Sequence, residues 1–341
     1  MSNRLDSKPQ IWTLAADLGL PTSEKPSRTI LDFVARRIRK IAKKFNCACL
    51  SDLLNATAGE VSTVFEEIHS DDDLRQIRLK YVTKGETAFA NLEDELSGAK
   101  DYAITIRRMH REPWEPQFVS VIDCRFDKVF RSYFSKWHEL AHLLTLTPQM
   151  RLVFRRTHSS SAVQDPEERL MDAIASEVGF FREFLPHDVG DDISFEMIER
   201  IRQECCPAAS RQAGMIGIVK ALPQPCILLQ AELALRKSEA ARATQMVMDI
   251  GLTEPTPVLR AVYVTVNDAA RGRGINFHKN WRVPDESVIA RVFESGGQSE
   301  SPEDLSSWTT SGGSHLRACP VMVKAKKNWE TVVALLIPQF D

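Results

Sequence analysis

Residues 118–146 constrain the fold more than any other part of the chain. The run FVSVIDCRF at 118–126 carries β-branched and aromatic residues over the length of a strand. An apolar helical pattern follows it directly, from about Lys128 to Leu146, and Pro148 marks its end. A strand that passes at once into a buried helix predicts a mixed domain in which helices pack against a sheet.

Other segments continue this mixture of helices and strands. An amphipathic helix is expected over 27–45, and helical pattern extends from there to about Val82. Helical pattern returns over 195–222, is interrupted at Pro207, and continues to about residue 245. The Gly/Ser-rich segment 294–314 is expected to be a mobile loop. Further strand-length runs lie at 103–109, 258–266, 315–325 and 330–338.

The changes between helical and strand-like sequence patterns predict domain borders near residues 190 and 255. The expected fold class is α+β. It comprises a helical and sheet-containing domain over 1–190, a helical linker over 191–255 and a β-rich domain over 256–341.

Composition bounds the class of protein. Hydrophobic residues make up 43% and charged residues 26% of the 341, which is the balance of a globular protein, and the formal charge of -2 argues against a wholesale nucleic-acid coat. Seven cysteines without framework spacing indicate reduced thiols. No apolar run approaches the roughly 18 residues needed to span a bilayer, and the first residues lack the apolar stretch of a signal peptide. The expected compartment is the cytoplasm, with no membrane partner.

The predicted helix over 128–146 contains HELAH at 138–142. Residues four apart lie on one face of a helix, so His138 and His142 can bind one ion, and an H-E-x-x-H helix is typical of zinc peptidases. Glu139 can then accept a proton from water as a general base. The alternative is a buried helix with two incidental histidines, which the apolar flanks would suit equally well.

A third ligand is expected in the helix that begins near Glu167, behind Asp165-Pro166. Glu168 can bind the ion, and Asp172, one turn further on, can accept a hydrogen bond from a ligand histidine and fix its tautomer. Glu167 and Glu177 compete for the ligand position. Acidic residues are also common at the start of a helix without any metal, because they favour the helix dipole.

The segments RSYFSKWHELAHLL and ERLMDAIASE together resemble the ImmA/IrrE-type zinc metallopeptidases, over about residues 118 to 186. The signature of that family is H-E-x-x-H followed by E-x-x-x-N/D in a later helix. The resemblance implies a zincin-like domain with Zn²⁺ on His138, His142 and Glu168. It also implies Glu139 as the catalytic base and Asp172 as the residue that supports a ligand histidine.

The resemblance carries expectations about the rest of the chain. Members of the family join the peptidase to a helix-turn-helix-like segment and a GAF-like sensor domain, which 191–255 and 256–341 match in order. The same order occurs in CapP-type peptidases, which are paired with CapH-type repressors in CBASS antiphage operons. The implied function is cleavage of a helix-turn-helix repressor, which releases DNA-damage or phage-defence genes. The alternatives are a non-enzymatic DNA-binding regulator with a structural metal and a small-molecule amidase.

Three further expectations concern substrate, signal and transition state. A substrate peptide can pair edgewise with the strand FVSVIDC. Single-stranded DNA, the activator suggested by the resemblance, can bind the segment RGRGINFHKNW, although a solvated loop is the plainer reading. That segment offers the basic residues Arg271, Arg273, Lys279 and Arg282 and the aromatic residues Phe277 and Trp281. His158 is a weak candidate for stabilising an oxyanion.

Overall fold

The computed structural model describes residues 5–98, 101–147, 165–186, 192–236, 239, 256–310 and 312–340. The chain is a mixed α+β protein with two sheets, and it divides into two compact units. Unit 1 comprises 1–185 and 201–217, and unit 2 comprises 186–200 and 218–341. Among the described residues, no helix is both long and apolar enough to cross a membrane.

Unit 1 is organised around a three-stranded sheet in the order β1-β3-β2. Strand β3 (Phe118–Asp123) is central, with β1 (Thr63–Ile68) parallel to it and β2 (Ala103–Arg107) antiparallel. All six residues of β3 are buried. A strand covered on both faces and paired on both edges is the most protected position a sheet offers.

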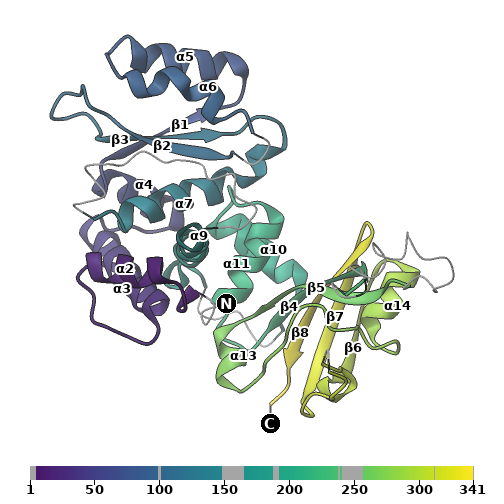
Figure 1. Ribbon diagram of the computed structural model, residues 1–341. Coiled ribbons are helices and arrows are strands. Elements are labelled where there is room, and N and C mark those ends of the chain that lie inside the picture. The colour runs from purple at the N-terminus through teal and green to yellow at the C-terminus, as the bar shows by residue number, and fades with distance from the viewer. Residues whose placement is uncertain are drawn as a thin grey trace. The chain divides into compact units, whose positions relative to one another are not determined.

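Helices cover both faces of this sheet (Figure 1). Helices α5 (Asp71–Val82) and α6 (Leu92–Glu95) lie on one face, and their apolar side chains pack on Ile104, Ile106 and Val119. Helices α4 (Leu50–Glu60) and α7 (Ser132–Leu144) lie on the other face. Because successive side chains of a strand alternate between faces, Thr105 and Ser120 point toward α7.

Other helical elements lie in the first 221 residues of the chain. The predicted helix over 27–45 is confirmed as α3 (Pro26–Lys44), whose Arg37 donates a hydrogen bond to the carbonyl of Leu144 at the end of α7. A cation at this position stabilises unsatisfied helix carbonyls. Before residue 186, the described residues also form α2 (Pro9–Asp17), η1 (Thr87–Asn91), η2 (Phe126–Arg131), α9 (Pro166–Val178) and η3 (Arg182–Phe184). Helices α10 (Phe195–Cys205) and α11 (Arg211–Ala221) confirm the interrupted helical pattern around Pro207.

Unit 2 contains a five-stranded antiparallel sheet in the order β5-β4-β8-β7-β6. Its described residues also form α13 (Asp268–Gly272), α14 (Val288–Ser295) and η4 (Leu305–Ser307). The strands are β4 (Ile227–Ala234), β5 (Val258–Val266), β6 (Gln298–Asp304), β7 (Pro320–Asn328) and β8 (Thr331–Pro338).

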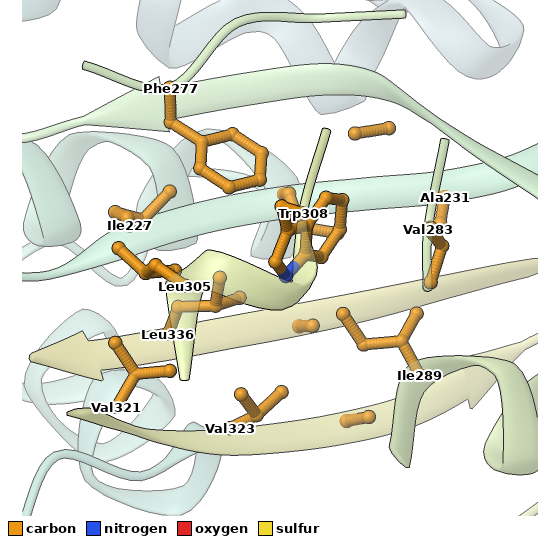
Figure 2. Close-up of a cluster of buried hydrophobic side chains, with 14 of the residues drawn as sticks. Ile227, Ala231, Phe277, Val283, Ile289, Leu305, Trp308, Val321, Val323 and Leu336 are labelled. Atoms are coloured by element: carbon orange, nitrogen blue, oxygen red, sulfur yellow. The ribbon is translucent and has the colours of Figure 1, made fainter. Parts of the chain in front are cut away.

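The core of unit 2 is drawn in Figure 2. Trp308, completely buried, lies among aliphatic side chains of the sheet and of α14, and its ring centroid lies 4.7 Å from that of Phe277 in an edge-to-face arrangement. Such a pair is favourable beyond the area it buries.

Three expectations about local structure were wrong. Helical pattern was expected up to Val82, but residues 63–68 form β1. Residues 227–234 were assigned to a helical linker and form β4, which lies inside the sheet of unit 2. The expected mobile loop over 294–314 contains strand β6 at an edge of that sheet. In each case pairing with distant strands overrides the local preference.

Candidate metal centre

Helix α7 carries the two histidines on a buried scaffold. Trp137, Leu140 and Leu144 of this helix are fully buried within unit 1, and their packing fixes the rotation of the helix about its axis. His138 and His142, one turn apart, then face the same way, and their side chains are only 11% and 15% exposed.

Helix α9 brings the acidic residues to the same place. Pro166 stands at its first position, and the Asp165 carboxylate accepts a hydrogen bond from the Glu167 amide. Glu168 therefore lies in the first turn and Asp172 in the second. Helix α9 packs along α7, where the Thr145 hydroxyl contacts the Met171 sulfur.

The donor atoms of His138, His142 and Glu168 all lie within 4.8 Å of one another. The two histidine Nε2 atoms are 3.2 Å apart, and Glu168 lies 3.1 Å from His138 Nε2 through Oε2 and 3.4 Å from His142 Nε2 through Oε1. Ligand atoms about 2.1 Å from a tetrahedral zinc ion lie about 3.4 Å from one another. The spacing and the chemistry of these donor atoms fit zinc.

Asp172 holds the first histidine. Its Oδ1 lies 2.9 Å from His138 Nδ1. A proton on Nδ1 is then shared with the carboxylate, which leaves the Nε2 lone pair directed toward His142 and Glu168. The carboxylate therefore selects the tautomer that can bind a cation.

Glu139 lies on the sheet side of α7 and is completely buried. Its Oε2 accepts a hydrogen bond of 2.6 Å from the Thr105 hydroxyl of β2. Thr105 is in turn 2.7 Å from the Ser120 hydroxyl of β3, which lies 3.2 Å from the hydroxyl of Thr63 on β1. A row of hydroxyl groups across all three strands thus ends at the glutamate.

The two competing carboxylates are not in this group. Among the described residues, the cluster that contains both histidines includes Glu168, and neither Glu167 nor Glu177 belongs to it. Burial raises the pKa of Glu167, and the negative charges of Asp165 and Glu168 raise it further.

Sequence reasoning missed Thr105 and Arg37. Thr105 is a hydroxyl-bearing residue in the apolar run AITIR, on the strand that precedes the central one. A hydroxyl at a position that would otherwise be apolar is the signal that could have identified it, because buried polar groups need a partner. Arg37 offered no signal, since it lies in the basic run of α3.

Two expectations about binding surfaces were wrong, and a third cannot be placed. Strand β3 is paired on both sides, so no substrate can pair with its edge. Phe277 and Trp281 are each only 5% exposed, so their rings belong to the core of unit 2 and offer no stacking surface for bases. Two of the neighbouring arginines are paired with carboxylates, Arg271 with Asp268 and Arg282 with Asp285. His158 lies outside the described residues.

Comparison with known proteins adds no identification. No family model matches the chain, and no curated protein matches it. Among solved structures, a Mycobacterium tuberculosis transcriptional regulator aligns with 92% of this chain and 82% of its own, at 10% identity and a TM-score of 0.33. At that TM-score the likeness supports no inference about function.

Proposed function

We propose that this chain is a zinc-dependent endopeptidase. The observation that carries the proposal is the convergence of His138, His142 and Glu168, with Glu139 beside them but outside the ligand group. Three protein ligands are the number that catalytic zinc sites use, whereas structural sites use four. When bound, the metal supplies Lewis acidity.

Side chains of the protein carry out the proton transfers and hold the reacting groups in place. Glu139 takes the proton of the attacking water and later delivers it to the departing amine. Thr105 holds Glu139 Oε2 at 2.6 Å and keeps the carboxylate in one orientation. Asp172, at 2.9 Å, keeps His138 in the tautomer that binds cations.

The proposed substrate is a helix-turn-helix repressor, and the proposed consequence is release of DNA-damage or phage-defence genes. This part rests on the resemblance to ImmA/IrrE-type and CapP-type peptidases. Unit 2 is proposed as the GAF-like sensor, with single-stranded DNA as its signal.

Glu139→Gln tests the proposal. The variant should bind as much zinc as the wild type and cleave a helix-turn-helix repressor substrate at least 100-fold more slowly, because the amide cannot accept the proton. The readouts are elemental analysis and an electrophoretic cleavage assay. Cleavage at the wild-type rate would exclude the mechanism.

The ligand set has its own test. Glu168→Ala should remove one equivalent of zinc, and Glu167→Ala, the neighbouring control, should remove none. Zinc that is lost from the control and retained in Glu168→Ala would show that the wrong carboxylate was chosen. A bound metal in a chain that cleaves no repressor would favour the non-enzymatic regulator.

A further inference from the structure

A second group of metal-binding side chains lies in unit 1, at the end of the sheet where β1 and β3 finish. We propose that Glu67, His69 and Cys124 form a separate site for a thiophilic divalent cation of the zinc class. Their donor atoms all lie within 4.8 Å of one another, and none of these residues belongs to the centre on α7.

The topology of the sheet brings the three residues together. Strands β1 and β3 are parallel, so their carboxyl ends lie side by side, with Ile68 opposite Asp123. The amide of Cys124 donates to the carbonyl of Ile68 at 2.8 Å, which continues the ladder one residue past β3. Cys124 therefore lies beside the end of β1, where Glu67 and His69 flank Ile68.

The backbone at His69 is fixed by hydrogen bonds at the start of α5, which do not involve the proposed ion. The Asp73 carboxylate accepts hydrogen bonds from the amides of His69 and Ser70, and the Ser70 hydroxyl accepts one from the Asp73 amide. This capping box starts α5. The start of α5 therefore fixes the backbone position of His69. Only the side-chain torsions of His69 remain to be ordered when an ion binds.

The donor distances suit a single ion. Glu67 Oε2 lies 3.4 Å from His69 Nε2 and 3.8 Å from Cys124 Sγ. A tetrahedral zinc with nitrogen and oxygen ligands at about 2.1 Å and sulfur at about 2.3 Å places such atoms about 3.4 and 3.6 Å apart. Both separations agree with this geometry to within a few tenths of an ångström.

The two oxygens of Glu67 have different partners. Oε1 accepts a hydrogen bond of 2.6 Å from Lys136 of α7, and Oε2 is the oxygen near His69 and Cys124. Lys136 therefore orients the carboxylate without occupying the oxygen that would bind the ion. The other acid at this end, Asp123, is held by Arg125 and Lys128 and stays outside the group.

The ligand types select the class of cation. Sulfur and imidazole favour zinc, cobalt and similar ions, whereas magnesium and calcium require oxygen ligands. Burial raises the pKa of the Cys124 thiol to about 11, so binding has to displace a proton from the sulfur. Glu67 and His69 are exposed, which leaves the ion a route from solvent.

Cobalt(II) titration of the reduced, full-length chain tests this inference. A cysteine ligand gives a thiolate-to-cobalt absorption band in the near ultraviolet, and the centre on α7 has no sulfur ligand. The wild type should show the band, which should saturate by two equivalents as both sites fill, and Cys124→Ser should lose it. Cys49→Ser, which removes an exposed free thiol, should keep it.

Variants of the other ligands complete the test. Glu67→Gln and His69→Ala should each weaken cobalt binding at this site at least tenfold. Glu66→Gln should not, because Glu66 is engaged with Lys80 and Tyr81 instead. The exposed His69 provides a variant that keeps the fold if Cys124→Ser does not.

The inference is overturned if the wild type shows no band, or if the band persists in Cys124→Ser or disappears in Cys49→Ser. The variant with both His138→Ala and His142→Ala should retain the band. That result is independent of peptidase activity, so failure of the proposed function would not affect it.

Discussion

At the scale of single residues, the hydroxyl of Thr105 is the contact that links the sheet to the chemistry proposed for α7. It reaches the buried Glu139 at 2.6 Å and is itself supported by Ser120 at 2.7 Å. A buried carboxylate that loses a donor is costly to the folded state and also free to turn. Thr105 is therefore a positioning residue for Glu139.

Thr105→Val, which keeps the side-chain shape, should lower the kcat of repressor cleavage about tenfold with little change in KM. It should also lower the free energy of unfolding by about 1–3 kcal/mol, because the buried Glu139 loses its donor. Thr57→Val is the matched control. The Thr57 hydroxyl is buried in α4 without a partner among the described residues, so its removal should leave kcat unchanged and stabilise slightly.

Steady-state kinetics and urea unfolding check both variants. Equal kcat values in Thr105→Val and the wild type would show that the hydroxyl only supports packing.

The residues of the candidate centre differ in how far the sequence could predict them. His138, Glu139 and His142 share one helix, and the helical period alone relates them. The choice of Glu168 over Glu167 and Glu177 as the third ligand depended on the family resemblance. The hydroxyl in the apolar run AITIR could have marked Thr105 as a buried polar residue, but its contact with Glu139 could not be predicted, because that contact depends on a strand register that no local pattern specifies.

At the scale of elements, the wrong predictions of secondary structure concern segments whose residues favour a helix or a loop but which pair with other strands in the folded protein. Strand β4 reads ILLQAELA, and Leu, Ala, Gln and Glu all favour helices. It is a strand because β5 and β8 pair with it on both sides. Strand β6 contains Pro302, which a sheet tolerates at an edge, where it lies opposite Met322 of β7. The strands of high β-branched content, such as β3 and β5, were predicted correctly.

The end of β3 depends on a buried ion pair. Asp123 is 1% exposed and bonds to both Arg125 and Lys128. Burial alone would raise the pKa of Asp123, but hydrogen bonds from Arg125 and Lys128 more than offset it, so the pKa lies below its ordinary value. The ionised carboxylate therefore stabilises the fold above its unfolded-state pKa of about 3.9. That stability is lost as the pH falls through the folded-state pKa.

Asp123→Asn should lower the free energy of unfolding at pH 7 by on the order of 3 kcal/mol, because Arg125 and Lys128 lose their buried partner. The loss should shrink as the pH falls below about 4, because the unfolded chain then binds a proton at Asp123 that the folded chain binds only at lower pH. Urea unfolding at a series of pH values measures this. The exposed Asp127→Asn serves as control. A loss that is the same at pH 3 and pH 7 would contradict the assignment.

Helix α11 packs so closely on Phe180 that only glycine fits at position 217. A Cβ atom there would lie 2.1 Å from Cδ2 of the buried Phe180 ring. Gly217→Ala should therefore destabilise the protein by about 1–3 kcal/mol, the usual cost of overpacking. Gly59→Ala in α4, where nothing lies within 4 Å of the added atom, should instead stabilise by up to about 1 kcal/mol. Thermal unfolding compares the two, and a stable Gly217→Ala would mean that α11 can move away from the ring.

At the scale of the whole molecule, the chain has two units, and each contains buried clusters of apolar side chains. One cluster lies between the sheet β1-β3-β2 and helices α5 and α6, and another lies within unit 2 around Trp308. Unit 2 takes in 186–200 and resumes at 218. A truncation at residue 255 would thus leave β4 without β5 and β8. An unpaired apolar strand is prone to aggregate, so a chain that ends at residue 255 should aggregate.

Metal should stabilise the two units unequally. All the described residues in candidate metal groups belong to unit 1. A ligand at 100 times its Kd stabilises the state that binds it by about 2.7 kcal/mol, which slows hydrogen exchange through unfolding by about 100-fold. Zinc should therefore slow exchange of the amides of α7 and α9 by about this factor and leave those of β4 and β8 unchanged. Hydrogen exchange measured by mass spectrometry, with and without zinc, follows both units in one sample.

The variant with both His138→Ala and His142→Ala should lose the part of the slowing that comes from the centre on α7. Equal slowing in both units would show that they unfold as one cooperative body, and it would remove the basis for treating unit 2 as a separately folded sensor.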